Sequence, residues 1–163
     1  MIKSNIIPGE LLTIAYNHGL KRTISNKRIR EENFKYYQSE PEKSDYVGCI
    51  AELCAMYELI KKGKGFEMSA LFDVNPIPAP DLILLSKTGK KLLIDVKGTE
   101  SNYKNVPVIK IEKVDQTKIN AYWFFKINIK KGSYISNFHT IEEVKKWHKK
   151  STFNNIIYRA EFT

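Results

Sequence analysis

The chain has 163 residues, of which 42% are hydrophobic, and this suits a single domain of ordinary size with a real core. Lys and Arg number 27 against 18 Asp and Glu, and the resulting net charge of +9 favours a polyanionic partner. The sequence has no apolar run of membrane-spanning length and no Cys/His cluster with metal-ligand spacing, so membrane spans, zinc fingers and iron–sulfur centres are not expected.

The first 43 residues are predicted to form a basic helical extension that packs on a core of residues 44–163, within one compact domain. Short helices are expected at Glu10–Tyr16 and around Glu31–Tyr37, with a basic segment between them. Basic side chains interleaved with Tyr and Phe can grip a phosphate backbone and stack on bases. The alternative is a solvated pair of amphipathic helices, and both interpretations remain open.

A helix is predicted over residues 44–62, because Ser44 or Asp45 can cap its start and a glycine follows its end. Its middle is almost wholly apolar, and Glu52 lies on an uncharged face that is expected to pack on a sheet. Glu52 is therefore either partly wetted on a rotated helix or directed at a site beside the sheet. Glu58, close to two Lys residues at the helix end, is expected to face solvent.

The two cysteines of the chain, Cys49 and Cys54, are five residues apart on this predicted helix. That separation is awkward for a disulfide, and the pair lacks the spacing of a redox or zinc motif. We expect both to be reduced, buried thiols, and we therefore expect a cytoplasmic protein.

Two short aliphatic strands joined by a tight turn are predicted in the middle of the chain. The strands are Leu82–Leu85 and Leu92–Lys97, and the turn is Lys87–Lys90. Continuous apolar runs of this kind are typical of strands covered on both faces. An edge strand is expected before them, around Phe66–Leu71.

The charged residues of this hairpin are unusual for a purely structural element. Asp81 opens the first strand and Asp95 lies near the end of the second, so an antiparallel hairpin brings the two carboxylates to one edge. Side chains alternate along a strand, so Lys97 shares the face of Asp95 while Val96 turns into the core. Ionised groups beside a core are costly unless they are paired or bind a metal, and carboxylates suit Mg²⁺ or Mn²⁺.

Pro80-Asp81 followed by Asp95-Val96-Lys97 resembles the signature of the PD-(D/E)xK nuclease superfamily. The resemblance implies a restriction-endonuclease-like α/β fold, a mixed β-sheet flanked by helices with an αβββαβ core. It also implies a Mg²⁺ site, with Mn²⁺ as a possible substitute, held by Asp81, Asp95, the carbonyl of Val96 and a Glu from the preceding helix, here Glu52. Lys97 would orient the attacking water and stabilise charge on the phosphorane. The alternative is a surface hairpin whose charges are solvated.

After the hairpin the sequence predicts strands at Val106–Ile111, Tyr122–Ile129 and Tyr134–Phe138. Helices are expected at Lys113–Asn120 and at Ile141–Lys149. Some members of the superfamily place an extra Gln or Lys on the helix before the last core strand, near the scissile phosphate, and Gln116 and Lys118 are the candidates here. Ordinary helix surface is an equally good interpretation of both residues.

The function predicted from these residues is a metal-dependent endonuclease that hydrolyses phosphodiester bonds in DNA, acting as a homodimer if it cuts both strands. The alternatives are a non-catalytic nucleic-acid-binding module or a protein-interaction module on the same fold.

Overall fold

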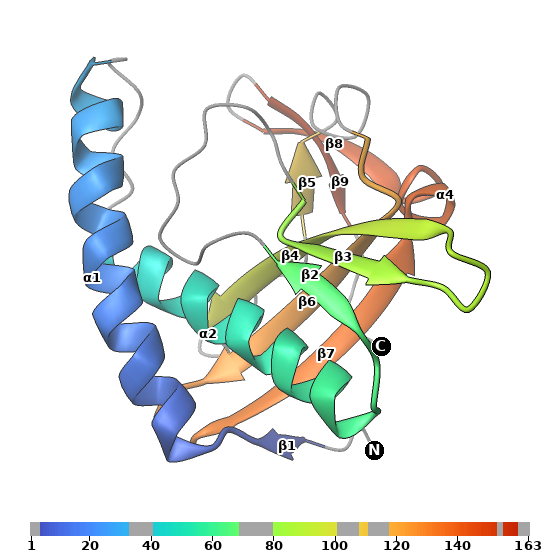
Figure 1. Ribbon diagram of the computed structural model, residues 1–163. Helices are drawn as coiled ribbons and strands as arrows, with labels where there is room; N and C mark the ends of the chain where they lie inside the picture. Colours follow the sequence, from blue (N-terminus) through green and yellow to red (C-terminus); the bar gives the residue numbers. More distant parts are fainter. Residues whose placement is uncertain are drawn as a thin grey trace.

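The computed structural model describes residues 4–32, 41–68, 80–100, 108–110, 118–152 and 155–159. Two long helices, α1 (Gly9–Glu32) and α2 (Pro41–Lys61), pack against each other, and α2 lies across one face of a six-stranded sheet (Figure 1). Among these residues, no helix is long and apolar enough to cross a membrane.

The six-stranded sheet is mixed, because β4 and β6 are parallel while the other neighbouring strands are antiparallel. This confirms the predicted α/β class with a mixed sheet flanked by helices. The helix predicted between β4 and β6 falls largely outside the described residues, and residues 118–120 are not helical. In spatial order the strands are β1 (Asn5–Ile6), β7 (Ser133–Thr140), β6 (Ala121–Asn128), β4 (Lys91–Glu100), β3 (Leu82–Leu85) and β2 (Phe66–Met68).

A second, three-stranded antiparallel sheet was not predicted from the sequence. Its strands, in spatial order, are β5 (Val108–Lys110), β9 (Asn155–Arg159) and β8 (His148–Thr152). The strand predicted around residues 106–111 therefore exists, but it belongs to this sheet and not to the main one.

Strand β6 is at the centre of the core and is buried on both faces. Trp123 and Phe125 belong to the cluster that α2 covers, whereas Tyr122 and Phe124 pack on the opposite face with Val144. Val144 closes α4 (Ile141–Val144), a single turn with a capping box between Thr140 and Glu143. A central strand with one parallel neighbour is covered on both faces of the sheet, so aromatic and aliphatic side chains are needed on both of its faces.

The β3–β4 hairpin is less covered than the sequence predicted. Its turn is as expected, with Gly89 at φ +77° and its N–H donating to the carbonyl of Ser86. Leu82 and Ile94 are buried, but Leu85 is 49% exposed. The reason is position: within the described residues only the three-residue β2 lies beyond β3 in the sheet, so the hairpin tip extends past the core.

Helix α1 has 24 residues and includes both the short helix predicted at Glu10–Tyr16 and the start of the basic segment after it. The second predicted helix, around Glu31–Tyr37, lies largely outside the described residues. Gly19 does not interrupt α1 but lies at its crossing with α2, where an added Cβ would come within 2.9 Å of the Cα of Tyr46. The glycine therefore permits close packing of the two helices. The division into an extension of residues 1–43 and a core of residues 44–163 remains a prediction.

Two other predicted helix boundaries are wrong. Helix α2 begins at Pro41 and not at residue 44, and proline is well tolerated in the first turn of a helix. The basic helix predicted at Ile141–Lys149 ends at Val144, after which the chain turns and enters β8. The Trp147 ring packs on the sheet, with its centroid 5.6 Å from that of Phe124 in a tilted arrangement and 5.0 Å from that of His139 in an edge-to-face arrangement.

Candidate active site

The hairpin register brings the two aspartates of the motif to the same end of the sheet. Leu82 pairs with Ile94, so Asp81 and Asp95 are the next opposed positions. The Asp81 carboxylate turns toward the backbone of β4 and accepts the N–H of Val96 at 2.6 Å. Proline supplies no N–H at the preceding position, and strand pairing ends there. Beyond the end of the backbone pairing, the Asp81 carboxylate therefore accepts the Val96 N–H.

Lys97 and Asp95 lie on the same face of β4, as the alternation of the strand predicts. The Lys97 ammonium forms an ion pair with the Asp95 carboxylate, and their side chains are 35% and 17% exposed. Val96, between them, is buried on the opposite face under α2. Asp95 is opposite Tyr122 in the parallel register with β6, so this acid and Lys97 are on the face away from α2.

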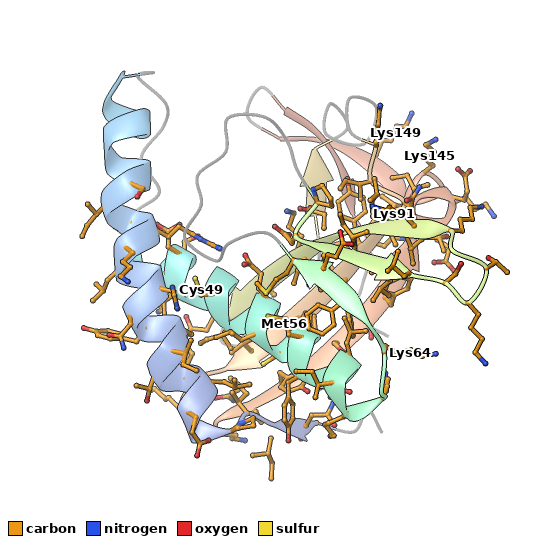
Figure 2. The ribbon with its side chains drawn as sticks, viewed as in Figure 1. Cys49, Met56, Lys64, Lys91, Lys145 and Lys149 are labelled. Carbon is orange, nitrogen blue, oxygen red and sulfur yellow. The ribbon has the colours of Figure 1, made fainter. Side chains whose placement is uncertain are left out.

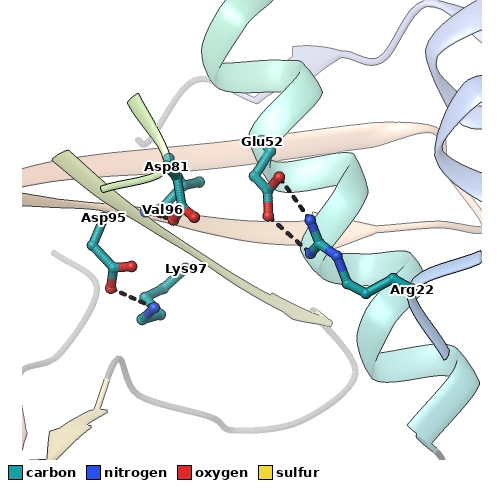
Figure 3. A network of polar contacts seen from close by, with 6 residues as sticks. All are labelled: Arg22, Glu52, Asp81, Asp95, Val96 and Lys97. Carbon is teal, nitrogen blue, oxygen red and sulfur yellow. Dashed lines mark hydrogen bonds and ion pairs between the residues drawn. The ribbon is translucent and has the colours of Figure 1, made fainter. Parts of the chain in front are cut away.

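Glu52 reaches the site from the other side of the sheet, on α2. The helix passes very close to β4 at Gly98, where an added Cβ would lie 2.7 Å from the carbonyl oxygen of Val47 and 2.9 Å from the Cβ of Ala51. Glu52 follows Ala51 directly and is one of two buried charged residues in the described part of the chain. Figure 3 shows Asp81 between Glu52 on one side of β4 and the Asp95–Lys97 pair on the other.

Arg22 of α1 is a member of this network that sequence reasoning did not identify. Its two terminal nitrogens each donate to one oxygen of Glu52, both at 2.9 Å (Figure 3). In the sequence, Arg22 belongs to the basic segment after the first predicted helix, for which both phosphate contact and an ordinary solvated helix remained open. Nothing local distinguishes it, because its partner is 30 residues away and the contact depends on how two helices cross.

The electrostatics of the site follow from several acids held close together away from water. Burial raises the pKa of Asp81 to about 8, and the charges of Asp95 and Glu52 add to the effect, while Lys97 and the Val96 N–H oppose it. Burial also raises the pKa of Glu52, against the opposing hydrogen bonds and charge of Arg22. For Lys97, burial lowers the pKa but the negative charges of Asp95 and Asp81 outweigh it, so the net shift is upward. The three carboxylates of the site are therefore only partly neutralised by the positive charges of Lys97 and Arg22.

Comparison with known proteins gives structural likenesses only. No protein-family model matches the chain, and no curated protein matches it. Among solved structures, a bacterial homing endonuclease aligns with 74% of this chain and 76% of its own, at 12% identity and a TM-score of 0.48. A Holliday junction resolvase from the archaeal hyperthermophile Archaeoglobus fulgidus aligns with 67% of this chain and 85% of its own, at 18% identity and a TM-score of 0.42. Identities this low assign no role to any residue of the chain.

The predicted site residues are thus partly assembled. Asp81, Asp95, Val96, Lys97 and Glu52 come together at one edge of the sheet, while Gln116 lies outside the described residues. The carboxylates are distributed over both faces of β4, and within the described part of the chain no three His, Cys, Asp or Glu side chains are grouped closely enough to hold a metal ion. The acids and the lysine are in place, and the roles given to them remain proposals.

Glu58, expected in solvent, is in fact partly buried. Its carboxylate accepts a very short hydrogen bond from the hydroxyl of Tyr134, its side chain is only 12% exposed, and Lys62 is 3.9 Å away. Tyr134 lies on β7, under α2, and is itself buried. Glu58 has a structural partner inside the core, and it is not a rival to Glu52 for the site.

Proposed function

We propose that this protein is a metal-dependent endonuclease that hydrolyses phosphodiester bonds in DNA. The observation that carries the proposal is the meeting of Asp81, Asp95 and Lys97 at the open end of the β3–β4 hairpin, with Glu52 approaching from α2. A scaffold gains nothing by gathering three carboxylates beside a core, since each raises the cost of ionising the others.

The donor set fits a hard divalent cation such as Mg²⁺ or Mn²⁺. Asp81, Asp95 and Glu52 supply carboxylate oxygens of the preferred kind. The N–H and C=O of one strand residue point to the same side of the strand, so the carbonyl of Val96 faces the edge at which its N–H binds Asp81. As they stand the three carboxylates are not grouped closely enough for a metal, so these four groups would hold the ion only after their side chains close on it. A bound ion would polarise the scissile phosphate and activate a water molecule.

Lys97 has the second chemical role in the proposal. Its ammonium stays protonated, because Asp95 and Asp81 hold its pKa up, and its side chain is about one-third exposed toward the site. A fixed positive charge here can orient the attacking water and stabilise the negative charge that develops on the phosphate oxygens during in-line attack. The site needs no dedicated histidine base if the water is already activated.

DNA is the proposed substrate because the chain is strongly basic, with a net charge of +9, and polyanions gain affinity by releasing counterions. One site cuts one strand, so cleavage of both strands of a duplex would use a homodimer. We place the protein in the cytoplasm, and the support is that Cys49 and Cys54 are buried and form no disulfide. Figure 2 labels Cys49 on α2.

The experiment is incubation of the purified protein with supercoiled plasmid and Mg²⁺ or Mn²⁺, with an EDTA control. Asp95→Asn and Lys97→Met test the site while nearly preserving side-chain volume. Glu142→Gln is the matched control, because Glu142 is 74% exposed on α4 and pairs only with its helix neighbour Lys145 among the ion pairs of the described residues. We expect metal-dependent cleavage by the wild type and the control, and none by the two site variants.

A non-catalytic nucleic-acid-binding module is the second candidate. One observation favours it: Asp95 is paired with Lys97 and Glu52 with Arg22, which is the arrangement of a structural charge network. Salt-dependent DNA binding without cleavage under either metal would select this candidate. Cleavage that is lost in Asp95→Asn would exclude it.

A further inference from the structure

Helix α1 is fixed to α2 by three contacts that follow one another along the chain. At Gly19 the backbones approach so closely that an added Cβ would be 2.9 Å from the Cα of Tyr46. The hydroxyl of Thr23 donates to the Asp45 carboxylate at 2.9 Å. Between these two points Arg22 extends across the crossing to Glu52. The N-terminal helix is thereby brought within reach of the candidate site.

The Arg22–Glu52 contact is a bidentate ion pair that is largely shielded from solvent. Both carboxylate oxygens are engaged in a fork of two 2.9 Å hydrogen bonds. The side chains of Arg22 and Glu52 are only 17% and 12% exposed. One turn before Glu52, α2 has Gly48, where even a methyl group would come within 3.2 Å of the Arg22 terminal nitrogen. The glycine leaves the space through which the arginine passes.

We propose that Arg22 is a positioning residue of the candidate site: it holds the Glu52 carboxylate at the edge of the sheet where Asp81 and Asp95 lie, so that α1 sets the metal affinity of the site. This inference rests on the proposed function. Arg22 acts through Glu52 and touches neither substrate nor metal. A planar fork fixes both the place and the plane of a carboxylate, which a lysine ammonium cannot do.

Two effects of opposite sign decide what removal of Arg22 does. The loss of one positive charge strengthens the attraction of the site for a cation. Against this, Glu52 would be left in a mostly buried position beside two other carboxylates, without a partner. A buried charge without its partner is strongly unfavourable, so the Glu52 carboxylate would turn away from its present position toward solvent. This response removes a ligand, and the loss of an outer-shell partner typically weakens metal affinity by about 10- to 100-fold.

The test measures Mn²⁺ affinity of the DNA-free protein by calorimetry, with free Mn²⁺ followed by electron paramagnetic resonance. The variants are Arg22→Gln, Arg22→Lys and Thr23→Val. Thr23→Val is the matched control, because it breaks an adjacent α1–α2 hydrogen bond without touching Glu52. We expect Arg22→Gln to weaken Mn²⁺ binding by about tenfold or more, Arg22→Lys to recover part of the loss, and Thr23→Val to remain within about twofold of wild type.

A double-mutant cycle with Glu52→Gln separates positioning from general loosening of the helix pair. If Arg22 acts through Glu52, the Arg22→Gln/Glu52→Gln protein binds Mn²⁺ no more weakly than Glu52→Gln alone. If Arg22→Gln does not fold, Arg22→Lys, which keeps the charge and loses the fork, is the deciding variant and is expected to bind Mn²⁺ more weakly than wild type.

The outcomes distinguish this inference from the proposed function. Wild-type Mn²⁺ binding and DNA cleavage, with unchanged or tighter Mn²⁺ binding in Arg22→Gln or unchanged binding in Arg22→Lys, would overturn the inference alone. An equal loss in Thr23→Val would also overturn it, since helix docking would then be the cause. A wild type that neither binds Mn²⁺ nor cuts DNA would overturn both.

Discussion

Replacement of Gly98 by alanine is expected to destabilise the protein and to disable the candidate site together. At this residue α2 lies directly against β4, and the added methyl carbon would be 2.7 Å from the Val47 carbonyl oxygen and 2.9 Å from the Ala51 Cβ. Helix backbone is one of these neighbours, so the clash cannot be relieved by rotating a side chain. The helix must move away from the strand, and Glu52 moves with it.

The magnitude follows from two opposing terms. Overpacking of a closely packed contact costs about 1–3 kcal/mol. A Gly-to-Ala change also restricts the unfolded chain, which stabilises by about 0.4–1 kcal/mol. We therefore expect a net loss of about 1.3 kcal/mol in the free energy of unfolding for Gly98→Ala. This is equivalent to a drop in melting temperature of about 3–5 °C for a chain of this size.

Gly65→Ala is the matched control, because a Cβ at Gly65 would have no neighbour within 4 Å and its backbone has no positive φ. The same unfolded-state term acts there without the clash, so that variant should be as stable as wild type or slightly more stable. Urea unfolding followed by Trp fluorescence measures both, with plasmid cleavage as the second readout. A Gly98→Ala protein within about 0.5 kcal/mol of wild type would refute the close-packing argument.

Three further predictions concern groups inside the fold. Because the pKa of Asp81 is raised to about 8 from an unfolded value of 3.8, the folded state binds its proton more tightly, so this group's stabilisation is present below pH 3.8 and is lost as pH rises through about 8. Asp81→Asn should abolish cleavage yet reduce this fall in stability between pH 5 and pH 8 in metal-free unfolding experiments, and an unchanged pH profile would contradict the assignment. Tyr134→Phe leaves the partly buried Glu58 carboxylate without its hydroxyl donor and should cost about 1.5–3 kcal/mol in urea unfolding without loss of metal-dependent cleavage. Burial raises the pKa of Cys49 to about 11 and that of Cys54 to about 12, so both should resist alkylation in the folded protein near neutral pH and react after denaturation; rapid labelling of the native protein would show that α2 opens.

The hairpin and its three charged residues could be predicted because everything that positions them is local. A turn with a glycine at positive φ fixes the register of β3 on β4, and the register alone brings Asp81 opposite Asp95. Alternation along one strand then places Lys97 beside Asp95. No contact from elsewhere in the chain is needed for these inferences.

The parts that sequence reasoning missed depend on contacts between distant elements. Arg22 meets Glu52 across a helix crossing, and Tyr134 meets Glu58 across 76 residues. Glu58 was expected in solvent because its sequence neighbours are lysines, yet α2 turns that position toward β7. The basic helix predicted at Ile141–Lys149 has the right composition, but it ends at Val144, and Trp147 packs on Phe124. Tertiary packing overrides local propensity in each case.

The charge balance of the site combines residues that the sequence predicts, such as Lys97, with Arg22, which only the tertiary structure brings to the site. Glu52, Asp81 and Asp95 are three acids facing two cations, Lys97 and Arg22, so the fully ionised site has a formal charge of about −1. A divalent cation would change this to about +1, and one phosphodiester group would bring it to zero. With neither Arg22 nor Lys97 the acids would repel DNA even after a metal had bound. Under the proposed function, a bound metal together with Lys97 and Arg22 offsets the charge of the three acids and of one phosphodiester group, and Arg22, the second of those cations, is supplied by α1.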